Sequence, residues 1–287
     1  MRDCHECHLA REGETGLHWF TRPVRGVNAM EWVEWLLSRE FRQFLLDNNL
    51  FFPLLFVVRL LGVTTLESFV PARKVPYRSV LILDIIGSAV LVYLTTPAAG
   101  YLRSFIAVHP VVPESILTLP TVVVFLLYYV VGDFGAYWMH RFWHLSPIWP
   151  VHRWHHSPTS MYWLAGYRAS LLQLVLQGLP WALAYSVLGM APWWIFLVVT
   201  TSHILLNDWM HMNVSWRSNW LEWMFVTPRF HHVHHSVNLT LANSNFGVTF
   251  SIWDRLFGTY VNPETVKEEL SFGIGEQVPL VRLIAGV

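Results

Sequence analysis

Residues 140–156 read HRFWHLSPIWPVHRWHH, and residues 231–235 read HHVHH. These stretches contain three histidine patterns, which are HxxxH from His140, HxxHH from His152 and HxxHH from His231. Eleven of the fifteen histidines of the chain lie between His140 and His235. Neutral imidazole is the commonest protein ligand for transition metals. Three such clusters in about a hundred residues therefore predict a metal site.

The composition indicates that this site belongs to a membrane protein. Hydrophobic residues make up 54% of the chain and charged residues 13%, and there are sixteen tryptophans. Four apolar segments approach the roughly 20 residues that a helix needs to cross a bilayer, namely 79–102, 119–139, 170–188 and 192–206. A fifth segment, 51–66, is shorter and contains Arg59, so whether it crosses stays open. We expect an all-α integral membrane protein with about four transmembrane helices. Buried core helices of a soluble protein are the alternative, which four such long runs disfavour.

The order of these segments predicts on which side the histidines meet. Two apolar segments separate the second histidine cluster from the third, so the chain returns to the same side of the membrane. Arginines occur in the loop 141–168 and from residue 217 onward, whereas the connection at 189–192 has none. By the positive-inside tendency, we expect a cytoplasmic histidine-rich helical cap.

Charge and cysteine usage exclude other classes of protein. Nineteen basic residues balance nineteen acidic ones, so nothing favours nucleic-acid binding. Cys4 and Cys7 alternate with His5 and His8, but four ligands within five residues seldom form a tetrahedral site. We therefore expect no metal at the N-terminus, which also lacks the apolar core of a cleavable signal peptide.

Helical spacing predicts which side chains face the metals. Asp133, Tyr137, His140 and His144 form one helical stripe, and an intramembrane aspartate is costly unless it is paired or functional. Asp133 could accept an imidazole N–H, or it could bond to a neighbouring helix. Nine imidazoles exceed the roughly four to six positions of a single ion and suit two ions. The predicted ligands are His140, His144, His152, His155, His156, His211, His231, His234 and His235. His232 points about 100° away from His231 on a helix, so we expect it to face elsewhere.

These motifs resemble the sterol desaturase and fatty acid hydroxylase superfamily of membrane diiron proteins. The resemblance covers roughly residues 84–260 and includes D-x3-Y-x2-H-R-x2-H from Asp133, His211-Met-Asn213, Thr227-Pro228 and WDRLFGT at 253–259. It implies a four-helix membrane base, two ferrous ions and oxygen-dependent attack on an unactivated C–H bond of a lipid. Asp133 and Asn245 are the candidate catalytic residues. Zinc could replace iron in a recombinant sample.

The chain departs from the family at several positions. Many members have D-x-N-Y-G where this chain has Asn243-Ser-Asn245-Phe246-Gly247, which removes a carboxylate and a phenol. Some members have a histidine where Asn207 stands here, and His203 is a further candidate ligand. These changes bear on metal tuning and on the choice of substrate.

The resemblance also predicts partners and domains. The sequence has neither a glycine-rich dinucleotide fingerprint nor a haem motif, so an external ferredoxin or b-type cytochrome with its reductase must supply electrons to the reaction with O2 and lipid. We expect a polar and amphipathic segment at 1–49, a fatty acid hydroxylase-like membrane diiron domain at 50–262 and a tail at 263–287. A histidine-rich metal-handling membrane protein and a catalytically dead lipid-binding relative are the alternatives to a hydroxylase or desaturase.

Overall fold

The computed structural model describes residues 50–90, 113–189, 193–267 and 269–287. The predicted polar and amphipathic segment at 1–49, which includes Cys4 and Cys7, lies outside these residues. The chain divides into two compact units, residues 1–62 and 63–287. Of the first unit, the structure describes only residues 50–62. These residues include the first part of helix α3 (Phe51–Phe69), which continues into the second unit. The second unit contains all three histidine clusters.

Within the described residues, the second unit is helical, and extended pairing is limited to isolated bridges such as Phe225 with Phe250. The longer helices after α3 are α4 (Tyr77–Val90), α6 (Thr121–Trp143), α9 (Leu179–Leu188) and α10 (Trp193–His211). The shorter ones are α7 (Trp149–Arg153), α8 (Leu171–Leu176), α11 (Asn219–Met224), α12 (Pro228–His234), α13 (Leu239–Ala242), α14 (Ile252–Leu256) and α15 (Leu280–Ala285). Three 3₁₀ turns complete the set, η3 (Glu114–Thr118), η4 (Trp163–Tyr167) and η5 (Pro263–Thr265).

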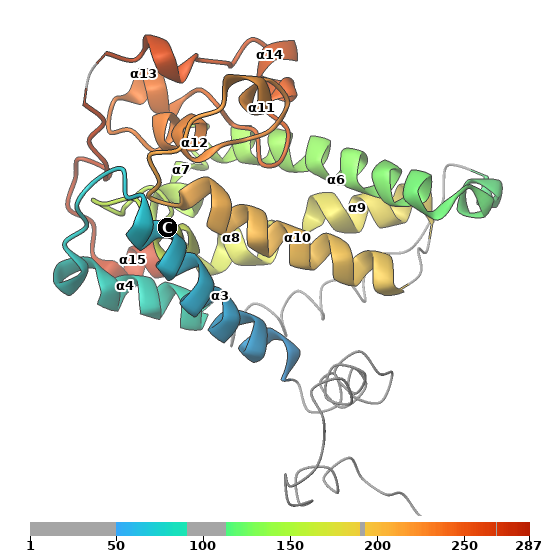
Figure 1. Cartoon of the computed structure of the whole chain (residues 1–287), viewed down its shortest axis with the longest axis horizontal. Coiled ribbons are helices and arrows are strands. Elements are labelled where there is room, and N and C mark those ends of the chain that lie inside the picture. Colours follow the sequence, from blue (N-terminus) through green and yellow to red (C-terminus); the bar gives the residue numbers. More distant parts are fainter. Residues whose placement is uncertain (1–49, 91–112, 190–192, 268) are drawn as a thin grey trace, which may run out of the picture. The chain divides into compact units, whose positions relative to one another are not determined.

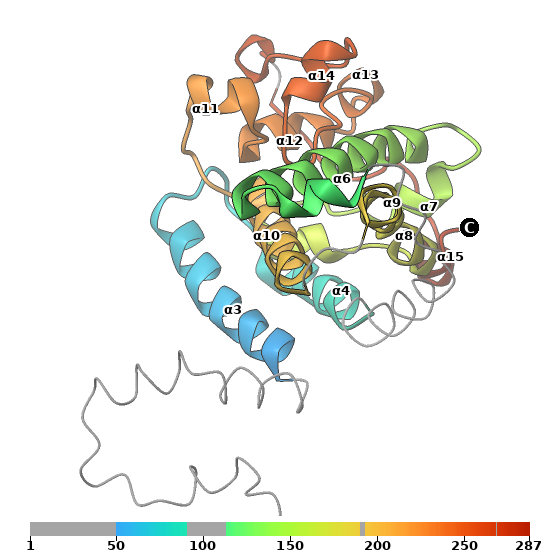
Figure 2. The same ribbon diagram turned by 90° about the vertical axis from the view of Figure 1, so that its right-hand side faces the viewer.

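Helices α6, α9 and α10 run side by side, as Figures 1 and 2 show from two directions. A cluster of apolar side chains joins the three helices, including Tyr128 of α6, Leu188 of α9 and Val199 of α10. Gly132 allows α6 and α9 to approach closely, because a Cβ atom there would lie 2.2 Å from the ring of Trp181. The interior of this bundle is therefore packed to contact by aromatic side chains.

Two stretches are long and apolar enough to cross a membrane, α6 and residues 171–188, which comprise α8 and α9. Both coincide with predicted segments. The predicted segment 192–206 lies within α10, and 79–102 begins in α4 and continues into residues that are not described. The two stretches agree with the predicted all-α membrane protein.

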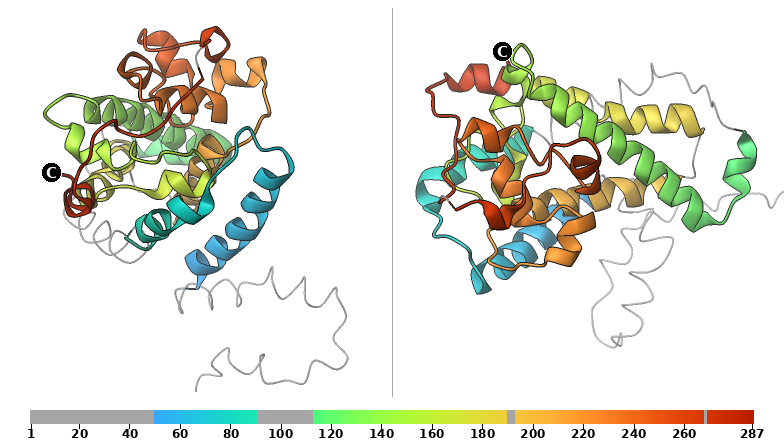
Figure 3. Two further views of the ribbon diagram at one scale, coloured as in Figure 1. Left: turned by 90° about the vertical axis from the view of Figure 1, so that its left-hand side faces the viewer. Right: turned by 90° about the horizontal axis from the view of Figure 1, so that it is seen from above.

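The segment from α11 to α14 folds back against α6, as the views in Figure 3 show. Asp133 of α6 accepts hydrogen bonds from the backbone N–H groups of Thr249 and Phe250, at 2.9 Å and 3.2 Å. Helix α12 packs on α10. These contacts bring the third histidine cluster to the end of α6 that carries the first.

Candidate metal centre

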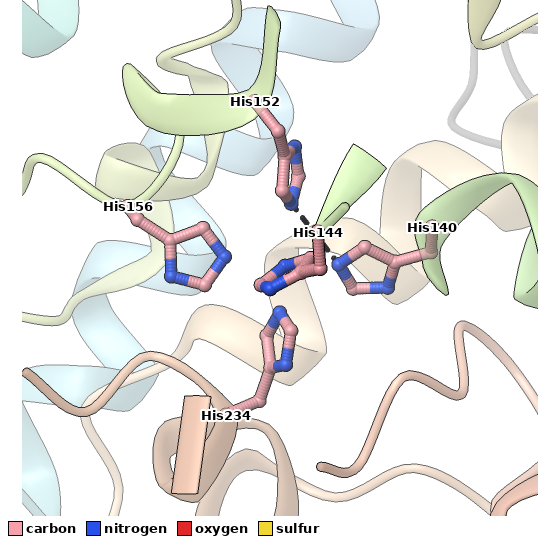
Figure 4. A group of neighbouring side chains, drawn as sticks. All are labelled: His140, His144, His152, His156 and His234. Atoms are coloured by element: carbon pink, nitrogen blue, oxygen red, sulfur yellow. Dashed lines mark hydrogen bonds between the residues drawn. The ribbon is translucent and has the colours of Figure 1, made fainter. Parts of the chain in front are cut away.

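The structure brings all nine predicted ligands together in two groups. The first group contains His140, His144, His152, His156 and His234, and the second contains His155, His211, His231 and His235. Within each group the nitrogen atoms that could bind a metal lie within 4.8 Å of one another. Figure 4 shows the five rings of the first group converging on one point, from the end of α6, from α7 and the turn after it, and from α12.

Each HxxHH motif divides its histidines between the two groups. His152 and His156, which are four residues apart, belong to the first group, and His155 belongs to the second. The third cluster is reversed, because His231 and His235 belong to the second group and His234 to the first. The HxxxH pair completes the first group, and His211, the last residue of α10, completes the second.

The nitrogen atoms that point into the first group have the chemistry of a cation site. Among the described residues, the Nε2 atoms of His144, His156 and His234 are buried and have no hydrogen-bond partner. The Nε2 atoms of His140 and His152 lie 3.1 Å apart. A buried nitrogen without a partner is costly, and a shared metal ion would satisfy these atoms at once.

The second group is equally convergent. The Nε2 atom of His211 lies 3.3 Å from that of His155 and 3.1 Å from that of His231. The Nε2 atoms of His231 and His235 are 3.0 Å apart. Such a ring of nitrogens fits transition-metal ligation through Nε2.

Backbone carbonyls fix the tautomer of several ligands. The Nδ1 atoms of His140 and His211 lie 2.7 Å from the carbonyl oxygens of Phe246 and Asn207, and Nδ1 of His234 lies 2.8 Å from that of Ser244. A carbonyl can only accept, so each Nδ1 carries the proton and each Nε2 presents its lone pair to the group.

Burial keeps these imidazoles neutral. The pKa of His155 is lowered well below its ordinary value by burial and then by neighbouring imidazoles, and the same holds for His152, His156, His231, His234 and His235. Neutral imidazole is the form that binds metals, so the site is ready for ligation at neutral pH.

The two groups are adjacent, because imidazole rings of one group stack on rings of the other. The ring centroids of His156 and His235 are 4.4 Å apart and stacked, and those of His152 and His155 are 4.8 Å apart. Ions held in the two groups would therefore be close neighbours.

Local sequence explains why α12 presents its histidines in this way. Thr227 is the N-cap of α12, where its side chain accepts a hydrogen bond from the N–H of Phe230, and Pro228 follows at the first helical position. Both residue types favour a helix start, because they suit the unpaired N–H groups there. The helical turn after this start fixes the directions of His231 and His234.

The structure shows the hydrogen-bond partners of Asp133. Its fully buried carboxylate accepts hydrogen bonds from Thr249 and Phe250 N–H and, at 2.8 Å, from the indole of Trp253. These partners lie in the segment folded onto α6, so of the two roles that the sequence left open, the bond to a neighbouring element is the one present. The carboxylate holds the backbone and the indole, and the ligand tautomers are held by carbonyls instead.

Asn245, the second predicted catalytic residue, bonds to the backbone of neighbouring segments. Its backbone is left-handed, with φ of 54°, and its side chain is fully buried. The amide donates to the carbonyls of Phe230 and Val261 and accepts from the N–H of Val261 at 2.8 Å. Asparagine tolerates this backbone conformation better than most residues. Asn245 thus shapes the loop whose carbonyls hold His140 and His234.

Sequence reasoning missed the residues that hold this loop. Asp254 accepts from the N–H groups of Phe246 and Gly247, both at 2.7 Å, and from the hydroxyl of Thr259 at 2.6 Å. Burial raises the pKa of Asp254 to about 6, although these three donors favour its charged form. The WDRLFGT stretch at 253–259, which contains Asp254 and Thr259, was the feature of the sequence that could have indicated their role. The side chain of Asn243 acts against the lowering of the pKa of His144 by burial, so the departure from the family at this position bears on a predicted ligand.

Of the histidines that the structure describes, two lie outside both groups. His203 is stacked on Tyr129 and meets the edge of Trp181 at 4.2 Å between centroids, so it belongs to the aromatic interior. The Nδ1 atom of His232 accepts from Arg73 at 3.2 Å, and its Nε2 donates to the carbonyl of His211 at 3.4 Å. His232 therefore supports a ligand through the backbone.

Residues 125–259 match the model of the fatty acid hydroxylase family. Alkylglycerol monooxygenase of Xenopus tropicalis is 35% identical over 144 residues, which are 50% of this chain and 31% of that protein. Ornithine lipid hydroxylase OlsE of Rhizobium tropici is 34% identical over 136 residues, 47% of this chain and 40% of that protein. Methylsterol monooxygenase 1-1 of Arabidopsis thaliana is 25% identical over 167 residues, 55% of each chain.

These similarities relate the stretch 125–259 to the sterol desaturase and fatty acid hydroxylase superfamily. The matched stretch contains all nine clustered histidines. The chain spans between about a third and about half of the length of these relatives. No solved structure matches it significantly.

Proposed function

We propose that the protein is a membrane-bound, iron-dependent oxidoreductase that uses O2 to hydroxylate or desaturate an unactivated C–H bond of a lipid. The observation that carries this proposal is the pair of adjacent imidazole groups, whose neutral nitrogens converge on two points. The relatives support the same reaction class, since their names are monooxygenases and hydroxylases of alkylglycerol, ornithine lipid and methylsterol.

In this proposal each group holds one ferrous ion. The two ions would supply the activation of O2, and the chain supplies ligands, orientation and a dry surrounding. The carbonyls of Phe246, Ser244 and Asn207 hold the proton on Nδ1, so that Nε2 remains free for the metal. Zinc suits the same nitrogens and could occupy them as a surrogate.

The reaction needs an external electron donor. One atom of O2 enters the substrate in a hydroxylation and the other becomes water, which requires reducing equivalents and protons. The sequence contains no recognised motif for a nicotinamide, flavin or haem. A ferredoxin or a b-type cytochrome with its reductase is the proposed partner.

We propose that residues 50–262 form the membrane diiron domain, with a preceding segment at 1–49 and a tail at 263–287. Four segments cross the bilayer, 79–102, 119–139, 170–188 and 192–206, and the histidine-rich cap lies on the cytoplasmic face. The distribution of arginines supports this orientation. The position of His140 and His144 at the end of α6 supports a site at one face of the membrane.

The distribution of histidines disfavours the two alternative functions. A metal transporter needs ligands along a path through the bilayer, whereas the nine imidazoles gather at one end of α6. A catalytically dead relative would be expected to have lost ligands, whereas both groups offer at least four imidazoles. Iron-dependent oxidation is the function that uses all nine.

The test compares the protein with its His234→Ala variant in one host under isotopically labelled O2. Mass spectrometry of the total lipids should reveal lipids that carry labelled oxygen, or new double bonds, only with the unaltered protein. Equal lipid profiles from both proteins, with metal bound to the first, would refute the proposed activity.

A further inference from the structure

The outer surface of α6 carries a continuous apolar stripe. Its exposed side chains recur every four residues, from Val122 at 66% exposure to Phe142 at 46%. The full stripe is Val122, Leu126, Val130, Phe134, Trp138 and Phe142. The same helix buries the polar Asp133, Tyr137 and His140 within the protein. A helix that keeps its polar residues within the protein and exposes large apolar side chains is typical of a membrane span at the edge of a bundle.

Aromatic side chains of α14 and of the residue after it pack against this stripe of α6. The ring of Phe257, just after α14, lies 4.9 Å from Trp138 between centroids, and Trp253 lies 5.2 Å from Phe134. Leu256 is 64% exposed and Phe257 is 37% exposed beside these contacts. The apolar surface therefore continues from the spanning helix onto the segment that folds back against it.

Helix α11 continues the same surface. Its backbone is tied to α14, because the hydroxyl of Ser251 donates to the carbonyl of Glu222 at 2.7 Å and Nε of Arg255 donates to that of Trp223 at 3.1 Å. The polar side of α11 is turned inward, where Glu222 is only 2% exposed and pairs with Arg229 at 2.8 Å.

The apolar side of α11 faces outward. Trp220 is 80% exposed, Trp223 is 55% exposed and Met224 is 41% exposed. Together with Leu256 and Phe257 these residues make a surface that we call the aromatic apron. Five neighbouring large apolar side chains with this exposure indicate a contact surface.

The position of Asp133 gives the depth of the apron. Asp133 lies six residues before residue 139, where the proposed span 119–139 ends, which corresponds to about 9 Å along the helix. The backbone N–H groups of Thr249 and Phe250 bond to Asp133 at that depth. Backbone N–H groups at membrane depth require a partner within the protein. The carboxylate supplies it, and so allows the chain to enter the level of the bilayer.

We propose that α11 and α14 are not part of a water-exposed cap but are seated in the bilayer, with the aromatic apron at the boundary between headgroups and acyl chains of the leaflet nearest the metal centre. Continuity with the stripe on α6 favours lipid over a second copy of the chain or a partner protein. Tryptophan is typical of this boundary. Arg255 stacks on Tyr260 at 3.6 Å and is followed by Leu256 of the apron, so its cation would be available to a lipid phosphate. The inference rests on α6 crossing the membrane, which is part of the proposed function.

The experiment measures the depth of single spin labels in the full-length protein in nanodiscs of phosphatidylcholine and phosphatidylglycerol. The two native cysteines are first replaced, with Cys4→Ser and Cys7→Ser. Labels are then placed by Trp220→Cys and Leu256→Cys, which alter exposed side chains and should leave the fold intact. Leu126→Cys on the α6 stripe is the membrane control.

Glu276→Cys is the water control, because Glu276 is half exposed and pairs with Arg153 beyond the end of α6. Collisions with oxygen and with a polar nickel chelate are compared at each position. We expect Trp220→Cys and Leu256→Cys to resemble Leu126→Cys, with nickel collisions about tenfold fewer than at Glu276→Cys, because polar solutes enter hydrocarbon poorly.

Three results would overturn the inference. Nickel collisions at Trp220→Cys and Leu256→Cys as frequent as at Glu276→Cys, with Leu126→Cys protected, would place the apron in water while leaving the membrane span intact. Labels shielded from both reagents would indicate a covering protein or a second copy. Nickel access at Leu126→Cys itself would refute the membrane span, and with it the membrane part of the proposed function.

Discussion

Replacing His234 with alanine should lower the metal content, whereas replacing His232, which lies two residues away on α12, should leave the metal content unchanged. His234 presents a buried Nε2 without a protein partner to the first group, and its Nδ1 is held by the carbonyl of Ser244. His234→Ala removes one of five ligands. Losing a group that merely supports a ligand typically costs about 10- to 100-fold in metal affinity, so losing the ligand itself should cost at least about 100-fold.

His232 instead bonds to Arg73 and to the carbonyl of His211. His232→Ala leaves the partly buried guanidinium of Arg73 without this acceptor, which should lower the free energy of unfolding by about 0.5–1.5 kcal/mol. Both metals should remain. Support for His211 through its backbone should weaken affinity in the second group by about tenfold at most.

The assay is anaerobic reconstitution of each purified protein with ferrous iron, followed by metal analysis. The unaltered protein and His232→Ala should bind about two ions per chain, and His234→Ala about one, because the second group keeps its four ligands. Both variants replace a buried histidine of one helix, so general misfolding would affect them alike. If His232→Ala loses metal as completely as His234→Ala, the assignment of ligands in the third cluster is wrong.

Three further changes test other parts of the structure. Asp133→Asn should lower the free energy of unfolding, measured by thermal denaturation, by about 1–3 kcal/mol and leave the metal content unchanged. The reason is that an amide nitrogen cannot accept hydrogen bonds from the donors that the carboxylate serves. Loss of metal with unchanged stability would instead favour a hydrogen bond from Asp133 to an imidazole. Gly166→Ala should remove the metal of the second group alone, since a Cβ atom there would lie 2.4 Å from Nδ1 of His211; two bound ions would contradict this packing. Reporters after Val287 and within 147–162 should both be cytoplasmic, and opposite-side labelling would separate the histidine clusters.

The sequence could predict the nine ligands because helical geometry is local. Residues three and four apart share a helix face whatever the rest of the chain does, so HxxxH and HxxHH place imidazoles together before any tertiary contact is known. His211 was found through its position at the end of the last apolar segment and its match to the family. The two spans at α6 and 171–188 were predictable for the same reason, since length and hydropathy are local properties.

The surroundings of the ligands could not be predicted in this way. The partners of Asp133 lie more than a hundred residues away, on a segment whose return to α6 no local pattern encodes. The tautomers depend on backbone carbonyls, which every residue possesses and which therefore leave no signal in side-chain identity. Asn245 was taken as catalytic because of its place in a motif, whereas its φ of 54° and its bonds to Val261 are visible only in the folded chain.

The doubled histidines carry information about the number of ions. Adjacent residues on a helical turn diverge by about 100°, whereas residues four apart differ by about 40°. His155 and His156 therefore cannot easily face one point, and neither can His234 and His235. In the structure each adjacent pair is divided between the groups, and each pair four residues apart, His152 with His156 and His231 with His235, stays together. An HxxHH turn is thus suited to provide histidines to two neighbouring ions. The second cluster gives two histidines to the first group and one to the second, the third cluster does the reverse, and the rings of both lie between the two groups.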